Sequence, residues 1–317
     1  MGIQEQAKYS STPLAQFLDD RLPHRDAIVE SWTHTLLTAP DDSPRLDREH
    51  DSMGWALELR LGLDLANAPA RRQELSYLPI NRCTQLLTAA GFQHAPMGAL
   101  PASGTVDPIL LHWSRTHHPV CLDDAQRAVL TTCLDLASFR QPMHRWGETK
   151  TVDARRAFFA AMVGEDEYGH DAHLLDAFAH CWTAYLTRGR PRLTALGDRA
   201  IIAPELGSGF GIADLVIGNT LVDVKLATQP TTTAVQTWLR QLLGYVLLDH
   251  HNALRIDAIA VYSGHNAQLV TYSLPRLLAV ASPGTTPDLN ALRTDFQQAL
   301  RTELDNYVAW KERERYR

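Results

Sequence analysis

The chain has 317 residues, of which 45% are hydrophobic, so it is long enough to bury one large core or two smaller ones. Its formal net charge of -6 argues against a protein that coats nucleic acid through a strongly basic surface, but it permits a local basic patch. No apolar run reaches membrane-spanning length, and none of the four cysteines belongs to a C-x-x-C pair, which argues against a zinc ribbon. We therefore expect a cytoplasmic protein without a membrane association.

The first half of the chain is predicted to be mostly helical. Apolar residues recur at helical spacing in six segments: residues 13–38, 53–66, 70–90, 123–139, 154–163 and 171–187. A stretch rich in Gly, Pro, Ser and Ala, residues 91–108, is predicted to be a surface loop. We divide the chain into a mostly helical region, residues 1–150, and a second region, residues 151–317, that contains the core and a C-terminal helix.

The character of the sequence changes after Gly189-Arg190-Pro191. Five short runs rich in β-branched residues predict strands: residues 200–205, 212–217, 220–226, 256–262 and 268–272. Helices are predicted at residues 233–248, between the third and fourth strands, and at residues 287–311. The order helix, strand, strand, strand, helix, strand indicates an α/β fold with a mixed sheet.

The hairpin between the second and third predicted strands carries the chemistry. Gly218-Asn219 is a typical two-residue turn, which would pair Ile217 with Thr220 and place Asp214 directly opposite Asp223. Side chains opposed in this way have β-carbons roughly 4.5–5.5 Å apart. Lys225 is two residues beyond Asp223 and therefore points to the same face. The sequence thus predicts two carboxylates and an ammonium in one cluster, at the edge of an apolar core.

A divalent cation is the expected partner of this cluster. Two neighbouring carboxylates in a partly desolvated place repel each other, and a bound cation removes that cost. Carboxylate oxygens suit Mg²⁺ or Mn²⁺, which would polarise a phosphodiester and activate a water molecule. Lys225 would orient that water or stabilise the charge of the transition state. On the following helix, Gln241 and Tyr245 are four residues apart and share one face.

These motifs resemble the PD-(D/E)XK nuclease superfamily, and within it the RecB-like group. The resemblance consists of Gly209 five residues before Asp214, the Asp223-Val224-Lys225 strand, and the Gln241-x-x-x-Tyr245 helix, and it covers about residues 200–272. It implies a restriction-endonuclease-like core flanked by helices and Mg²⁺-dependent cleavage of DNA. Asp214 and Asp223 would bind the metal and Lys225 would be the catalytic lysine. Gln241 and Tyr245 would support the site and position the substrate strand.

The family pattern also implies a further metal ligand on an upstream helix, four residues after a glycine. Glu58, which follows Gly54, has that spacing and is predicted to approach the cluster as a third catalytic and metal-binding residue. Asp176, on the last helix before the first strand, and Glu205, at the end of that strand, are the alternatives. The sequence leaves the choice open.

Arg188, Arg190 and Arg192, with two arginines near residue 155, form the best candidate basic patch for binding DNA. The expected activity is hydrolysis of DNA phosphodiester bonds. Family association suggests a place in antiviral defence or DNA processing, with a protein partner or a homo-oligomer as further expectations. Two alternatives remain: a catalytically inactive nucleic-acid-binding or assembly subunit, and an RNA-cleaving effector.

Overall fold

The computed structural model describes residues 2–38, 50–65, 92–93, 114–115, 130, 133–134 and 172–315. These residues belong to two compact units. The first comprises residues 2–38, 192–263 and 268–315, and the second comprises the remaining described residues, including 264–267. In the first unit, the N-terminal helices pack with elements from the second half of the chain. The division of the chain at residue 150 stays a prediction.

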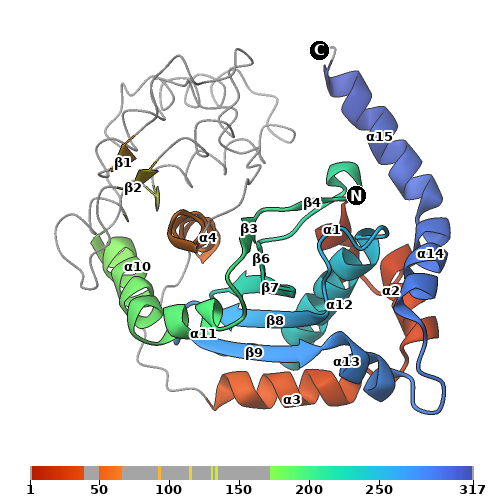
Figure 1. The fold of residues 1–317 in the computed structure, drawn as a ribbon, viewed down its shortest axis with the longest axis horizontal. Helices are drawn as coiled ribbons and strands as arrows, with labels where there is room; N and C mark the ends of the chain where they lie inside the picture. The colour runs from red at the N-terminus through yellow and green to blue at the C-terminus, as the bar shows by residue number, and fades with distance from the viewer. Residues whose placement is uncertain are drawn as a thin grey trace. The chain divides into compact units, whose positions relative to one another are not determined.

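A five-stranded mixed sheet forms the centre of the first unit (Figure 1). Its strands, in spatial order, are β3 (Ala200–Ile202), β6 (Leu215–Ile217), β7 (Thr220–Lys225), β8 (Ala258–Ser263) and β9 (Gln268–Ser273). All neighbours are antiparallel except β7 and β8, which are parallel and connected through helix α12 (Thr232–Leu248). The predicted mixed α/β class is confirmed.

Two of the predicted strands are each divided in two. The first ends at β3 because Ala203 has a positive φ of 46°, which turns the chain, although the Ala203 N–H still donates to the Asp214 carbonyl at 2.9 Å. The chain resumes as β4 (Glu205–Leu206), which pairs with β5 (Gly211–Ile212) in a separate small sheet. A single 3₁₀ turn, η4 (Gly207–Gly209), connects β4 to β5. This small sheet leads directly into Asp214 and β6.

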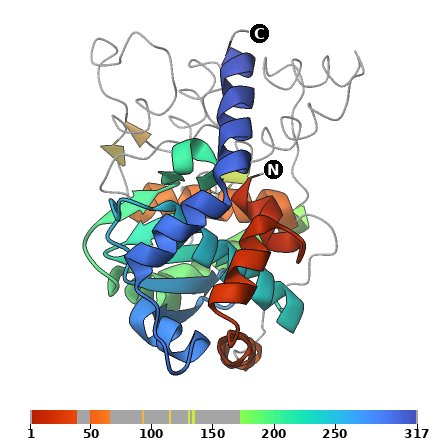
Figure 2. The same ribbon diagram turned by 90° about the vertical axis from the view of Figure 1, so that its right-hand side faces the viewer.

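Helix α12 is the helix on which most others of this unit pack (Figures 1 and 2). The structure places α1, α2, α3 and α14 against it, and α13 beside β9 and α3. Their bounds are α1 (Ile3–Lys8), α2 (Pro13–Arg21), α3 (Asp26–Leu37), α13 (Leu274–Ala281), α14 (Leu289–Ala299) and α15 (Arg301–Arg315). Neither α1 nor α13 was predicted from the sequence.

Two of the predicted long helices are interrupted. The helix expected at residues 13–38 is broken between α2 and α3, because Pro23 disfavours helical backbone at the residue before it, and Leu22 has φ -134° and ψ 61°. The helix expected at residues 287–311 is broken at Leu300, which separates α14 from α15. Each break allows the two halves to run in different directions.

The second unit contains α4 (His50–Leu65), α10 (Ala172–Ala184), the π-helical turn η3 (Tyr185–Gly189) and the paired strands β1 (Phe92–Gln93) and β2 (Ser114–Arg115). Helix α4 confirms the prediction for residues 53–66. In η3 the Arg190 N–H donates to the Tyr185 carbonyl five residues back, and this wider turn carries the chain past Pro191 into α11 (Arg190–Thr194). The predicted helix at 171–187 therefore continues further than expected. The predictions for residues 70–90, 91–108, 123–139 and 154–163 lie largely outside the described residues.

Candidate active site

The β6–β7 hairpin has the register that the sequence predicts. Ile217 pairs with Thr220 across a two-residue turn, and the pairing continues to Leu215 and Val222. One further step in the same register brings Asp214 opposite Asp223. The turn begins with Gly218 at φ +57°, as a type II′ hairpin turn requires.

Asp214 lies just before β6 and closes the open end of the hairpin. Its Oδ2 accepts a hydrogen bond from the Val224 N–H at 2.8 Å, so the carboxylate lies beside β7 rather than in solvent. This bond fixes the position of one Asp214 oxygen close to Asp223.

Asp223 and Lys225 lie on the same face of β7 and form an ion pair. The distance from Lys225 Nζ to Asp223 Oδ2 is 2.8 Å. Asp223 is almost fully buried at 1% exposure, whereas the Lys225 side chain is 21% exposed. The ammonium therefore lies between the buried carboxylate and the surface, where it can meet a substrate.

Helix α12 supplies the next group of polar contacts. Gln241 Nε2 donates to Asp223 Oδ1 at 3.4 Å and to Tyr245 Oη at 3.1 Å, so one amide connects both side chains. Gln241 and Tyr245 contact each other because positions four apart in a helix share a face. One turn earlier, the ring centroid of Trp238 is 6.0 Å from Lys225 Nζ, at the limit of a cation–π contact.

The electrostatics follow from burial and from the proximity of the two carboxylates. Burial raises the pKa of Asp223 to about 7; the Lys225 ammonium opposes this shift and the Asp214 carboxylate adds to it. Burial also raises the pKa of Tyr245 well above its ordinary value, and the charges of Asp214 and Asp223 act in the same direction. Tyr245 is therefore a neutral hydrogen-bonding group, and Asp223 binds a proton near neutral pH when no cation is bound.

The residues of the cluster fit a divalent cation in charge and chemistry. The Asp214 carboxylate adds to the raised pKa of Asp223, and a cation bound between the two carboxylates would relieve this repulsion. Asp214 and Asp223 provide the oxygen ligands that Mg²⁺ and Mn²⁺ prefer, and Mg²⁺ retains several waters. Within the part of the chain that the structure describes, no three or more Asp, Glu, His or Cys side chains gather as a metal site.

The structure does not select the third ligand. Glu58, on α4, and Asp176, on α10, belong to the second unit, so the prediction for Glu58 and its alternative stay predictions. Glu205 lies in the same unit as the cluster, on β4, where it pairs with Ile212.

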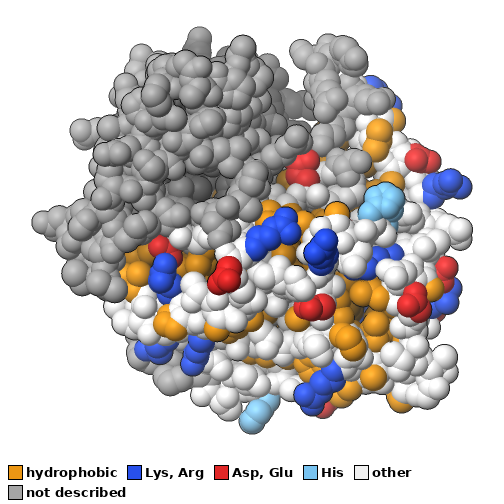
Figure 3. All heavy atoms as spheres, viewed as in Figure 1, with side chains coloured by type: hydrophobic (Ala, Val, Ile, Leu, Met, Phe, Trp, Pro, Cys, Tyr) orange, Lys and Arg blue, Asp and Glu red, His pale blue; other side chains and the backbone are white. Residues whose placement is uncertain are grey.

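The arginines predicted to bind substrate are exposed, and each has an intramolecular partner. Arg188 Nη2 donates to the Asn266 carbonyl at 3.4 Å, Arg190 Nε contacts Asp64 Oδ2 at 2.9 Å, and Arg192 Nη1 donates to Gln268 Oε1 at 2.9 Å. Acidic and basic side chains are interspersed over the described part of the face in Figure 3. The role of these arginines in binding DNA stays a prediction.

Sequence reasoning missed one residue next to the cluster. Ser263 ends β8 in register with Lys225, is buried, and its Oγ makes no hydrogen bond within the described chain. For Ser263 a signal existed, since parallel strands end at the same edge of a sheet.

Comparison of the chain with protein-family models, with curated proteins and with solved structures found no match. Among the described residues, no helix is both long enough and apolar enough to span a bilayer.

Proposed function

We propose that the protein is a metal-dependent nuclease of the PD-(D/E)XK type that hydrolyses DNA phosphodiester bonds. The observation that carries the proposal is the convergence of Asp214, Asp223 and Lys225, with Lys225 Nζ 2.8 Å from a buried Asp223 carboxylate. The restriction-endonuclease-like form of the core is part of the proposal. It is supported by a β3-β6-β7 antiparallel meander followed by α12 and the parallel strand β8.

Each residue of the cluster would have a separate task in this mechanism. Asp214 and Asp223 would hold Mg²⁺ or Mn²⁺, and the Val224 N–H and Gln241 amide keep the two carboxylates oriented. Such an ion, when bound, polarises the phosphodiester and lowers the pKa of a water ligand. Lys225, the more exposed member of its ion pair, orients the attacking water and stabilises the extra negative charge of the transition state. Burial of Asp223 strengthens its electrostatic interactions with Lys225 and the cation.

The test is a cleavage assay of the purified protein with Mg²⁺, Mn²⁺ or EDTA on linear duplex, circular duplex and single-stranded DNA. Asp223→Asn is the inactivating variant, because it removes one metal ligand with little change of shape. The matched control is Asp295→Asn, which removes an exposed carboxylate paired with Arg21 at 2.8 Å. Cleavage that needs the metal, survives in the control and is lost in Asp223→Asn supports the proposal. Equal rates in both variants refute it.

The second candidate is a nucleic-acid-binding or assembly subunit without catalysis. It is favoured by one observation, the lack of a third metal-ligating side chain beside Asp214 and Asp223 within the described residues. The same preparation separates the two functions: gel-shift binding of DNA without cleavage under any metal condition supports the binding subunit. An RNA arm of the assay distinguishes a ribonuclease from a deoxyribonuclease.

A further inference from the structure

Ser263 is a buried side chain beside the candidate active site that the mechanism above does not use. It is the last residue of β8, and the parallel pairing of β7 with β8 places it in register with Lys225 (Figure 1). Neighbouring strands lie about 4.8 Å apart, and residues in register direct their side chains to the same face of the sheet. Ser263 is therefore a neighbour of Lys225 on the face that also carries Asp223.

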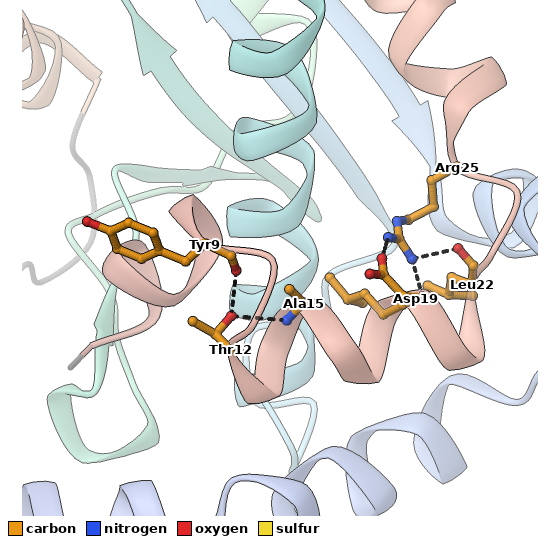
Figure 4. Close-up of polar contacts among 7 residues, drawn as sticks. Tyr9, Thr12, Ala15, Asp19, Leu22 and Arg25 are labelled. Carbon is orange, nitrogen blue, oxygen red and sulfur yellow. Dashed lines mark hydrogen bonds and ion pairs between the residues drawn. The ribbon is translucent and has the colours of Figure 1, made fainter.

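The Ser263 hydroxyl has no hydrogen-bond partner among the described residues, although the residue is only 3% exposed. Thr12, another buried residue of the first unit, shows the usual arrangement of a hydroxyl. Its Oγ1 lies 2.9 Å from the Tyr9 carbonyl oxygen and accepts the Ala15 N–H at 3.3 Å (Figure 4). A buried hydroxyl without a partner destabilises the folded protein, because it has lost its hydrogen bonds to water. The position of Ser263 is explained if its hydroxyl has a partner in another state of the site.

Binding of a cation would take the present partner of Lys225 away. The Lys225 Nζ lies 2.8 Å from Asp223 Oδ2, and the Asp223 carboxylate is one of the two proposed to hold Mg²⁺ or Mn²⁺. An ammonium and a divalent cation on the same carboxylate repel each other strongly. We therefore expect the ammonium to turn away from Asp223 when a cation binds, and it then needs another hydrogen-bond acceptor.

Ser263 has the chemistry and the place of such an acceptor. A lysine ammonium carries three donors on a flexible four-carbon chain, and a serine hydroxyl has two acceptor lone pairs. On the side of α12, the ring centroid of Trp238 is 6.0 Å from Lys225 Nζ. That ring offers the ammonium a π face but no hydrogen-bond acceptor, because the indole nitrogen only donates. On the side of β8, the residue in register with Lys225 is Ser263.

We propose that Ser263 is a positioning residue of the active site, which accepts a hydrogen bond from Lys225 when a divalent cation is bound by Asp214 and Asp223. The hydroxyl then holds the ammonium close to the cation, where it orients the attacking water. This inference rests on the proposed nuclease function. It adds a residue of β8 to a site whose other members lie beside β6, on β7 and on α12.

Calorimetric titration of the purified full chain with MgCl₂ tests the proposal without a need for activity. The variants are Ser263→Ala and Ser263→Cys, of which the second nearly keeps the side-chain volume but has only a weak acceptor. The matched control is Ser273→Ala, which removes an exposed hydroxyl at the end of β9 that makes no capping hydrogen bond to α13. We expect both Ser263 variants to raise the Kd for Mg²⁺ roughly 10-fold, the scale of one hydrogen bond to a charged group, and the control to keep the wild-type Kd. A wild-type Kd in both Ser263 variants overturns the proposal.

A double-mutant cycle identifies Lys225 as the partner of the hydroxyl. Lys225→Met removes the ammonium, so no charge has to leave Asp223 when Mg²⁺ binds and no acceptor is needed. We therefore expect Ser263→Ala to leave the Kd for Mg²⁺ unchanged when it is added to Lys225→Met. An equal loss of affinity with and without the Lys225 ammonium overturns the proposal.

Thermal unfolding in EDTA separates this role from a purely structural one. Because the Ser263 hydroxyl has no partner when no cation is bound, we expect Ser263→Ala to raise Tm by about 2–4 °C, whereas Thr12→Val removes a satisfied hydroxyl and should lower it. A Tm of Ser263→Ala as low as that of Thr12→Val would show a structural serine and overturn the proposal. Wild-type protein that neither binds Mg²⁺ nor cleaves DNA refutes the proposed function. Metal-dependent cleavage with an unchanged Mg²⁺ affinity of Ser263→Ala refutes the role of Ser263 alone.

Discussion

The Asp223→Asn substitution is expected to stabilise the metal-free protein at alkaline pH while it abolishes cleavage. Asp223 is fully enclosed, and its carboxyl has a pKa of about 7 in the folded protein, against an ordinary value of 3.8. A carboxyl whose pKa is raised on folding contributes stability that is fully present below the unfolded pKa. That stability is lost as the pH rises through the folded pKa. Metal-free stability should therefore fall between about pH 4 and pH 7.

The magnitude follows from the difference between the two pKa values. At 1.36 kcal/mol for each pH unit, a rise from 3.8 to about 7 corresponds to at most roughly 4 kcal/mol. The neutral amide of asparagine avoids this cost but gives up the ion pair with Lys225 at 2.8 Å. We therefore expect the variant to be about 1–3 kcal/mol more stable than the wild type at pH 8, and nearly equal to it at pH 4.

The assay is urea unfolding of both proteins in EDTA at several values between pH 4 and pH 8, followed by circular dichroism. The control is Asp295→Asn, which removes a partly exposed carboxylate paired with Arg21. Addition of Mg²⁺ should stabilise the wild type and not Asp223→Asn, because a ligand stabilises only the state that binds it. The reasoning is refuted if the stability of the wild type rises from pH 4 to pH 7 as much as that of the variant.

Three further predictions concern single residues. Lys225→Ala is expected to lower kcat at least 100-fold without loss of helix content, whereas Lys8→Ala, at an exposed lysine paired with its own helix, should leave cleavage unchanged in the same assay. Gly218→Ala is expected to lower the free energy of unfolding by about 2 kcal/mol or more, because φ is +57° and the new β-carbon would lie 2.3 Å from the Leu196 carbonyl oxygen; an unchanged urea midpoint would contradict the turn. Arg293→Met removes a buried guanidinium whose Nε donates to the carbonyl at the end of α12, and we expect a loss of about 1–3 kcal/mol by thermal unfolding, so a wild-type Tm would exclude that role.

The sequence by itself was sufficient for the local geometry of the cluster. The Gly218-Asn219 turn determines the register of β6 and β7, and the period of two then places Asp214, Asp223 and Lys225 together. Likewise, the spacing of Gln241 and Tyr245 on one helix is enough to bring their side chains together. These features depend on neighbours within about ten residues, so they can be read from a single chain.

Where the helices end was only partly decided by local sequence. Pro23 gives a local reason for the break after α2, which the helical spacing of residues 13–38 concealed. In contrast, the helical segment that begins with α10 continues through η3 and α11 to Thr194 in spite of Pro191. The wider π-helical turn before Pro191 accommodates the proline ring. The positive φ of Ala203, which separates β3 from β4, has no signature in the residue type.

The tertiary structure alone decided the environment of the cluster. The burial of Asp223, and with it the raised pKa, comes from the layer that α12 places over β7. Helix α1 has six residues, too few for a stable isolated helix in water, and it is stabilised by the packing of Ile3 closely against Gly211 and Gly244. These residues are more than 200 positions apart in the sequence, and no periodicity or propensity of either segment reports their contact, because it forms only when the whole first unit is folded.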